Sequence, residues 1–243
     1  MHEAAHPSIP QGARANVFEL THYLRESPVY IPQHYEEQDP AALRALIEAY
    51  PLGAWVTPDD GGIVVNHIPF LIDAQRGAFG TLVGHVAKAN PVWRSLTDEH
   101  ESVVIFRGPE AYVSPSWYPS KAEHGKVVPT WNYAAVNAFG SARAIHEQAW
   151  LLGLVERLTA IHESRRAAPW KVSDAPSDYI ARRLQAIVGI EIPIRRIEGK
   201  WKVSQNQSPA DRQGIVAGLD AEAQAEPTAM ARLVEKHAAD AAD

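Results

Sequence analysis

Six segments between residues 52 and 145 have the composition of β-strands, and they follow one another with few helical residues between them. They comprise residues 52–57, 63–72, 80–87, 102–108, 110–115 and 127–145. The first two flank Pro58-Asp59-Asp60-Gly61-Gly62, whose residue types are typical of a hairpin turn. Strands joined by short turns pair antiparallel, whereas a parallel sheet needs a helical crossover between successive strands. The order of segments therefore predicts an antiparallel sheet that closes on itself, in the α+β class.

Residues 80–94, GTLVGHVAKANPVWR, combine one of these strands with a polar turn. The strand pattern of period two ends before Pro91, because proline has no N–H to donate and disfavours helical geometry in the residue before it. Four polar side chains fall within ten residues: Thr81, His85, Lys88 and Asn90. A cation accompanied by neutral donors suits a phosphate group. The alternative is an ordinary strand whose polar face is solvated.

Helical periodicity and helix-start signals occur outside the strand-rich block. Asp39-Pro40 is a strong helix start, with an N-cap carboxylate and proline in the first turn, and the helix is expected to end near Ala49. Further helices are expected over residues 147–164, 176–188, 209–219 and 227–239, with a weaker one over 16–26. Residues 29–35 are expected to form an edge strand, and residues 190–205 a final hairpin that turns at Glu198-Gly199.

The composition limits the compartment and the chemistry. There is no apolar run of about 18 residues and no cationic-then-apolar start, so we expect neither a membrane span nor a signal peptide. The absence of cysteine excludes disulfides and thiolate metal sites, and cytoplasm is the expected location. We expect a flexible leader over residues 1–14, one domain over 15–219 and a helical tail over 220–243.

The charge is unevenly distributed. The whole chain carries a formal net charge of −6, yet residues 165–212 contain ten Lys or Arg against five Asp or Glu, a local excess of +5. A basic zone on an acidic protein is a candidate nucleic-acid patch. A solvated helix face or an internal charge partner is the alternative interpretation.

Seven segments of the chain resemble the PaiB family of FMN-binding negative transcriptional regulators. They are VYIPQHY, HIPFLID, GTLVGHVAKANPVWR, VVIFRGPEAYVSPSWYPSK, VVPTWNYAAV, PWKVSDAP and VGIEIPIRRIEGKWKVSQN, which span residues 29 to about 219. The resemblance implies an antiparallel split β-barrel like that of pyridoxine phosphate oxidase, in a homodimer with two FMN sites at the interface. In that wider group an Arg/Lys-x-x-x-x-x-Asn-Pro turn holds the FMN phosphate. The turn here, HVAKANP, is shorter, with His85 and Lys88 at its basic positions.

Under this resemblance, the FMN phosphate is expected at His85 and Lys88, with Asn90 in the same turn and Thr81 as a hydroxyl donor. The flavin ring is expected along residues 128–132, where Thr130 and Asn132 share one face of the strand and Trp131 points the other way. The remaining candidates are His67 and Phe70 beside that strand, Trp117 and Lys121 in a long loop over the flavin, and Gln205 from the other subunit. A structural histidine at 67 and a helix-capping glutamine at 205 are the alternatives.

Three functions follow from these expectations. The first is a regulator that senses flavin or its redox state and acts on transcription, either through DNA contact by residues 165–212 or through another factor. The second is an FMN-dependent NAD(P)H oxidoreductase that acts on a small molecule. The third is a haem-binding or haem-degrading protein, with His67, His85 and His124 as the candidate histidines.

Overall fold

The computed structural model describes residues 29–59, 61–222 and 225–239. The chain divides into two compact units, Met1–Ile31 and Pro32–Asp243, and every helix and strand given below lies in the second. The leader expected over 1–14 and the weak helix expected over 16–26 lie outside the described residues.

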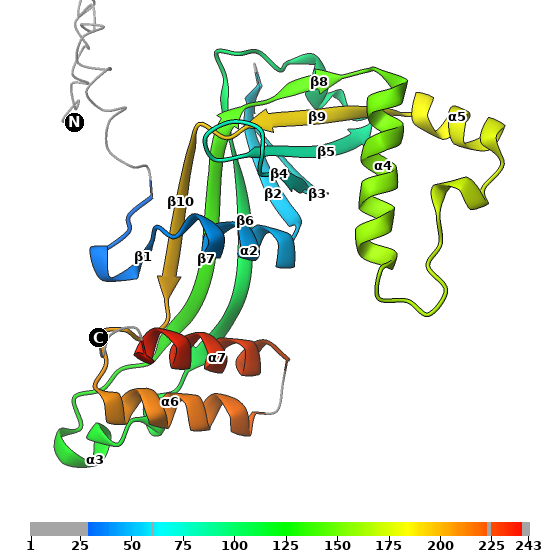
Figure 1. Ribbon diagram of the computed structural model, residues 1–243. Helices are drawn as coiled ribbons and strands as arrows, with labels where there is room; N and C mark the ends of the chain where they lie inside the picture. Colours follow the sequence, from blue (N-terminus) through cyan, green and yellow to red (C-terminus); the bar gives the residue numbers. More distant parts are fainter. Residues whose placement is uncertain (1–28, 60, 223–224, 240–243) are drawn as a thin grey trace, which may run out of the picture. The chain divides into compact units, whose positions relative to one another are not determined.

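The strands form two sheets in which every pairing is antiparallel, as predicted (Figure 1). The six-stranded sheet has the order β1 (Glu36–Glu37), β10 (Arg196–Lys202), β7 (Thr130–Ser141), β6 (Glu101–Val113), β2 (Leu52–Asp59), β3 (Gly62–Pro69). The four-stranded sheet has the order β4 (Leu71–Asp73), β5 (Thr81–Ala87), β9 (Ile187–Pro193), β8 (Arg143–Ile145).

Three chain segments pass directly from one sheet to the other, and they define a split barrel. The crossings lie at Phe70 between β3 and β4, at Ala142 between β7 and β8, and at Ile194-Arg195 between β9 and β10. The last crossing is held by backbone hydrogen bonds from Ile194 N to Gly80 O at 3.0 Å and from Arg195 N to Phe139 O at 2.9 Å. The predicted α+β split-barrel class is confirmed, although the two sheets do not close into one continuous barrel.

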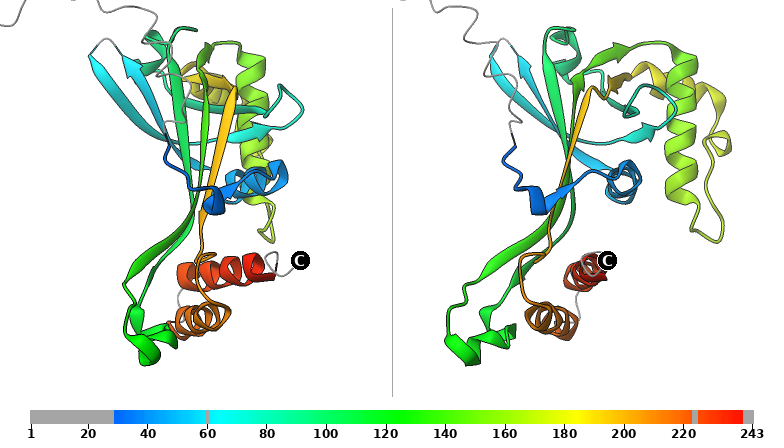
Figure 2. Two further views of the ribbon diagram at one scale, coloured as in Figure 1. Left: turned by 90° about the vertical axis from the view of Figure 1, so that its left-hand side faces the viewer. Right: turned by 60° about the vertical axis from the view of Figure 1, so that its left-hand side comes forward.

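Helices α2, α4, α6 and α7 lie on one side of the six-stranded sheet (Figure 2). The helices are α2 (Pro40–Ala49), α3 (Ser120–His124), α4 (Gln148–Glu163), α5 (Ser177–Gln185), α6 (Pro209–Ala221) and α7 (Ala225–Ala239), and the 3-10 helices are η1 (Gln33–Tyr35), η2 (Pro91–Arg94), η3 (Pro115–Trp117) and η4 (Val172–Asp174). The Asp39 carboxylate accepts the Ala41 N–H at 2.9 Å, which confirms the predicted start of α2. None of the described helices is both long enough and apolar enough to cross a bilayer.

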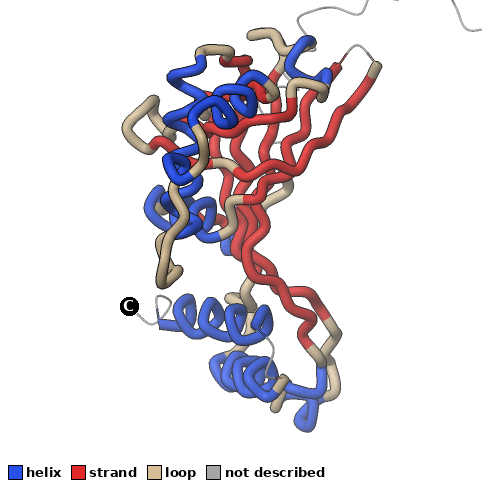
Figure 3. The backbone as a smooth tube through the Cα atoms, turned by 90° about the vertical axis from the view of Figure 1, so that its right-hand side faces the viewer, coloured by secondary structure: helices blue, strands red, loops and turns tan. Residues whose placement is uncertain are grey.

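Two hydrophobic clusters hold these layers together. The main one contains the inward side of the six-stranded sheet, including Trp55 and Phe106, together with the buried faces of α2, α6 and α7. Figure 3 shows how the long strands β6 and β7 continue down to the α6–α7 pair, which packs on β6. A second, smaller cluster lies under α4 and contains Leu71, Val83, Leu154 and Leu158, with Trp150 at its edge. Helix α4 therefore packs on its own satellite cluster.

Two predicted turns are absent, for different reasons. Residues 101–113 form one strand that passes through Gly108-Pro109 at a register shift between Arg107 and Glu110, a bulge that accommodates a proline. Residues 190–205 do not form a hairpin, because β9 and β10 belong to different sheets and β10 runs straight through Gly199. A Cβ on Gly199 would lie 2.3 Å from Leu43 Cδ2, so this glycine allows α2 to approach closely and makes no turn.

Smaller differences concern element ends. Residues 33–35 form the 3-10 turn η1, and the edge strand is the two-residue β1 that follows. Helix α5 ends at Gln185, and β9 begins at Ile187, inside the predicted helix. The loop expected over residues 117–126 contains the short helix α3. Residues 127–145, expected as one strand, are divided at Ala142 into β7 and β8.

Candidate functional site

The turn after β5 is held by hydrogen bonds on several sides. Lys88 N–H donates to Ala186 O at 2.8 Å, at the point where α5 gives way to β9. The Asn90 side chain caps η2 by accepting the Val92 N–H at 3.1 Å, and its amide donates to Asn66 Oδ1 on β3 at 2.7 Å. Asn90 therefore organises the turn, since both ends of its amide are already engaged within the chain.

Polar groups beside this turn remain available to a ligand. His85 Nδ1 and Asn66 Nδ2 are buried and have no hydrogen-bond partner within the described residues. Burial lowers the pKa of His85, so its imidazole is neutral at pH 7. The Lys88 ammonium is exposed, with no hydrogen bond or ion pair to another described residue. A cation without a partner, in the same turn region as unsatisfied polar atoms, fits the oxygens of a phosphate.

Two further candidates, His67 on β3 and Phe70 directly after β3, have different surroundings. His67 is exposed, and it lies on the opposite face of β3 from Asn66, because side chains alternate along a strand. Phe70 is 1% exposed, and its ring meets Phe106 edge-on with centroids 6.2 Å apart. Phe70 is therefore part of the core at a sheet crossing.

Thr81 lies at the other end of β5 from Lys88. Lys88 lies seven positions further along the chain, about 23 Å at 3.3 Å per residue of strand, so within one chain the two cannot contact the same phosphate. The Thr81 hydroxyl is buried and donates to Arg76 O at 2.9 Å. The expected grouping of Thr81 with His85 and Lys88 is therefore wrong for a single chain.

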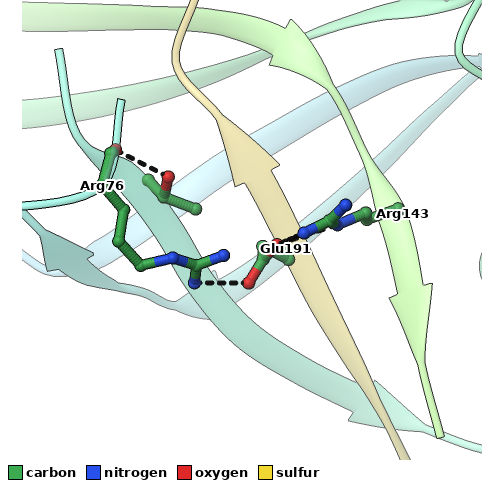
Figure 4. Close-up of polar contacts among 4 residues, drawn as sticks. Arg76, Arg143 and Glu191 are labelled. Carbon is green, nitrogen blue, oxygen red and sulfur yellow. Dashed lines mark hydrogen bonds and ion pairs between the residues drawn. The ribbon is translucent and has the colours of Figure 1, made fainter. Parts of the chain in front are cut away.

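An ion cluster lies next to Thr81, and the sequence analysis did not find it (Figure 4). Glu191 is 1% exposed and accepts from Arg76 Nη1 at 2.6 Å and from Arg143 Nε at 2.8 Å. Burial by itself raises the pKa of this carboxylate, but the hydrogen bonds from the two guanidinium groups outweigh burial and hold the pKa below its ordinary value. Register places Arg143 directly opposite Glu191, whereas Arg76 comes from the loop before β5.

Three other candidates lie at the far ends of β7 and β10. The Asn132 amide donates to Ser204 Oγ at 2.8 Å in a buried pair. Gln205 accepts from Val203 N at 2.9 Å and donates to Trp201 O, and Thr130 Oγ1 accepts from the Lys202 ammonium. These side chains join the strand ends to each other. Gln205 does not cap the following helix, because the N-cap of α6 is Ser208, whose hydroxyl accepts the Asp211 N–H at 3.1 Å.

This second group lies far from the Lys88 turn. The turn contacts β8, which follows the C-terminal end of β7, whereas Thr130 begins β7 eleven residues earlier. The distance along the strand is on the order of 30 Å. One chain therefore does not bring Thr130, Asn132 and Gln205 to the same ligand as Lys88.

Trp117 packs against α6. A Cβ on Gly218 would lie 2.3 Å from Trp117 Cδ2, and one on Gly214 would lie 2.0 Å from Trp117 O, so the two glycines make a groove for this residue. Lys121 Nζ lies 3.4 Å from Ser116 Oγ within the same exposed loop. The loop is thus fastened to α6 through its tryptophan.

The basic zone of residues 165–212 is dispersed over the fold. It runs from the loop after α4 through α5, β9 and β10 into α6, and several of its arginines pair with acids. Arg166 contacts Glu163 at 2.9 Å, Arg182 contacts Asp178 at 2.7 Å, and Arg196 pairs with Glu198. The zone therefore spans elements of both sheets, and its charge is partly neutralised within the chain.

Comparison with known proteins identifies the family. A family model described as "Putative FMN-binding domain" matches residues 29–196. The chain is 29% identical to the Bacillus subtilis protein named "Protease synthase and sporulation protein PAI 2", over 85% of this chain and 97% of that protein. It is 34% identical to the uncharacterized protein AN0679 of Emericella nidulans, over 79% of this chain and 90% of that protein.

Solved structures share the fold at low sequence identity. The flavocytochrome Anf3 of Azotobacter vinelandii aligns with a TM-score of 0.52 at 13% identity, over 72% of this chain and 74% of that chain. The FAD- and haem-binding protein of Mycobacterium smegmatis aligns with a TM-score of 0.52 at 19% identity, over 76% and 80%. The chain therefore belongs to the FMN-binding split-barrel family of PaiB type, and its cofactor is FMN.

Proposed function

We propose that this protein is a homodimeric FMN-dependent regulator that holds the flavin phosphate at the turn after β5. The observation that carries the proposal is the unpaired Lys88 ammonium, in a turn whose neighbours His85 and Asn66 each have a buried nitrogen without a partner in the described part of the chain. The phosphate would supply the negative charge that Lys88 lacks and acceptor oxygens for N–H donors. FMN contributes its redox-active ring, and the chain contributes binding and orientation.

The second half of the site would come from a partner subunit. One face of the six-stranded sheet, called the open face here, carries no described helix (Figure 2). Val56 on β2 is opposite Val65 on β3 and Val103 on β6, so these three side chains share that face. Ile63 and Val65 are 76% and 53% exposed. A contiguous apolar sheet face of this kind marks a protein interface.

A dimer also accounts for the separation of the candidate residues. The Lys88 turn and the Thr130–Gln205 group lie on the order of 30 Å apart within one chain. A twofold axis through the open face would bring the far end of one protomer towards the turn of the other. Trp131, 55% exposed with its ring 6.1 Å from Tyr112, would then face the partner.

The regulatory role rests on the Bacillus subtilis relative, whose name refers to protease synthesis and sporulation. The dispersal and pairing of the basic residues favour action through another factor over direct DNA contact. A gel-shift titration separates these routes, because phosphate contacts by several arginines produce a steep loss of affinity with salt. A shift at low salt that disappears steeply with added salt would favour direct contact.

The decisive experiment is an absorption spectrum of the purified protein with mass determination of the released ligand. A flavin spectrum and the mass of FMN are expected, and a Soret band after haem addition would favour haem binding instead. Anaerobic addition of NADPH separates regulator from reductase, since only a reductase is bleached. A protein that takes up no FMN at any concentration would contradict the proposal.

Substitution Lys88→Ala tests the location of the phosphate. Loss of one charge-assisted contact is expected to weaken FMN binding by about 1.5–3 kcal/mol, measured by flavin fluorescence titration. Lys236→Ala, an exposed lysine on α7, is the matched control and should bind FMN like the wild type. Equal affinity of the two variants would place the phosphate elsewhere.

A further inference from the structure

We propose that residues 146–186, called the helical arm here, are coupled to the flavin site through the turn after β5, so that bound FMN restrains the arm. The arm comprises His146, helix α4, the loop with η4, helix α5 and Ala186. The inference rests on the proposed position of the flavin phosphate at Lys88, and it adds a route by which occupancy of that site reaches another surface.

Both backbone polar groups of Lys88 are bound to elements that meet the arm. Its N–H donates to Ala186 O at 2.8 Å, at the C-terminal end of the arm. Its carbonyl accepts the Trp93 indole N–H at 3.1 Å. The ring of Trp93 meets the ring of His146 edge-on, with centroids 5.3 Å apart and an interplanar angle of 80°. The two ends of the arm therefore converge on one residue of the turn.

A third contact lies within β5, two register positions before its last residue, Ala87. His85 is paired with Gly189 on β9, and a Cβ on Gly189 would lie 2.3 Å from Trp150 Cζ3. Trp150 of α4 thus packs on the strand backbone directly opposite His85, whose Nδ1 has no partner in the described region. A ligand that orders His85 and Lys88 acts on the surfaces that α4 and α5 contact.

Few side chains of the arm are buried. Helix α4 packs on the satellite cluster around Leu154 and Leu158, outside the main core, and residues 164–171 are exposed. A segment with few buried apolar contacts opens locally at lower cost than the core. When a ligand stabilises the contacts that anchor such a segment, the segment opens less often, because a ligand shifts the equilibrium towards the state that it binds.

The arm presents exposed charged and aromatic side chains at its outer end. Trp170 and Tyr179 are 46% and 42% exposed, and Arg183 stacks over Tyr179 at 5.2 Å. Bound flavin would therefore set how rigidly this surface is presented, without any ligand contact to it. Coupling of this kind is reciprocal: whatever binds and orders the arm also strengthens FMN binding.

Hydrogen–deuterium exchange of the full chain, with and without saturating FMN, tests the coupling. Peptides covering residues 88–94 are expected to be protected by the ligand directly. Peptides within 146–186 are expected to exchange more slowly by about fivefold or more, the lower end of typical coupling between sites. Protection of 88–94 with unchanged exchange in 146–186 would overturn the inference and leave the proposed phosphate site in place.

Two variants interrupt the route at different points. Trp93→Phe retains a ring against His146 but lacks the N–H that holds the Lys88 carbonyl, whereas His146→Ala alters only the arm. Each should bind FMN at saturating concentration, protect residues 88–94, and lose at least half of the protection in 146–186. Trp170→Phe, at an exposed tryptophan away from the turn, is the matched control and should retain it.

The outcomes separate the two proposals. Full protection of the arm in both Trp93→Phe and His146→Ala would overturn the coupling route while FMN binding stands. Failure of the wild-type protein to bind FMN, seen from unchanged flavin fluorescence, would overturn the proposed function and this inference together. Loss of arm protection in both variants but not in Trp170→Phe would support the route.

Discussion

Single side chains in this protein act mainly by joining segments that are distant in the sequence. Glu191 on β9 binds Arg76 from the loop before β5 and Arg143 from β8. Asn90 joins the turn after β5 to Asn66 on β3. Burying any of these polar or charged groups without a partner would cost free energy. The partner on the other segment offsets that cost.

Replacing Glu191 by Gln should destabilise the protein in a pH-dependent manner. The folded-state pKa of Glu191 lies below its ordinary value of 4.5, so its stabilising contribution is present above pH 4.5 and is lost as the pH falls through the folded-state pKa. At pH 7 the variant should lose about 1.5–3 kcal/mol in urea unfolding, and the difference should shrink at acidic pH.

Asp178→Asn is the control for Glu191→Gln. Asp178 pairs with Arg182 on the surface of α5, where both side chains are largely exposed, so a change within about 0.5 kcal/mol is expected. A Glu191→Gln variant as stable as this control at pH 7 would show that the two arginines do not need the carboxylate.

At the scale of elements, glycines decide how closely neighbouring elements approach each other. Gly189 lets Trp150 of α4 lie on β9, Gly199 lets Leu43 of α2 lie on β10, and Gly218 lets Trp117 lie on α6. In each case a methyl group would come within about 2.3 Å of an existing atom, closer than any real contact. Gly153, in the middle of α4, has no neighbour within 4 Å and therefore has no packing role.

The pair Gly189→Ala and Gly153→Ala separates the packing of α4 on β9 from the helix propensity of α4 itself. Gly189→Ala should displace Trp150 and cost about 1–3 kcal/mol, the range for overpacking a filled site. Gly153→Ala should stabilise by about 0.5–1 kcal/mol, because alanine is favoured over glycine within a helix. Chemical denaturation measures both, and destabilisation by Gly153→Ala would contradict the observed open space.

At the scale of the whole molecule, the open face and the separated candidate residues point to the same assembly. The face includes exposed Val65 and Ile63 on β3, next to Val56 and Val103. Edge strand β3 also leaves one side of its backbone unpaired within the six-stranded sheet. An isolated chain would expose both features to water, which is a hazard that association removes.

Val65→Asp should therefore produce a monomer that binds FMN poorly. A buried carboxylate within an apolar interface is costly, and a monomer has only the Lys88 half of the proposed site. Light scattering coupled to size-exclusion chromatography gives the mass, and fluorescence titration gives the affinity. Ile161→Asp, at an exposed isoleucine on α4, should leave both unchanged. A Val65→Asp protein of dimeric mass would place the interface elsewhere.

Sequence alone determined the features that depend on a few neighbouring residues. Asp39-Pro40 starts α2, and Asn90-Pro91 ends the strand and begins η2. Capping and proline geometry act within one turn of the chain, so the helix and strand ends that they set do not depend on the tertiary fold. The proximity of His85, Lys88 and Asn90 was predictable for the same reason.

Only the tertiary structure decided which distant segments meet. It separated Thr81 from Lys88 by the length of a strand, and Thr130 from the same turn by the length of a longer one. It also joined Arg76 and Arg143 to Glu191, and Trp93 to His146. Strand order and sheet crossings determine these contacts. Both result from the burial of apolar surface over the whole chain, so a local pattern of residues does not predict them.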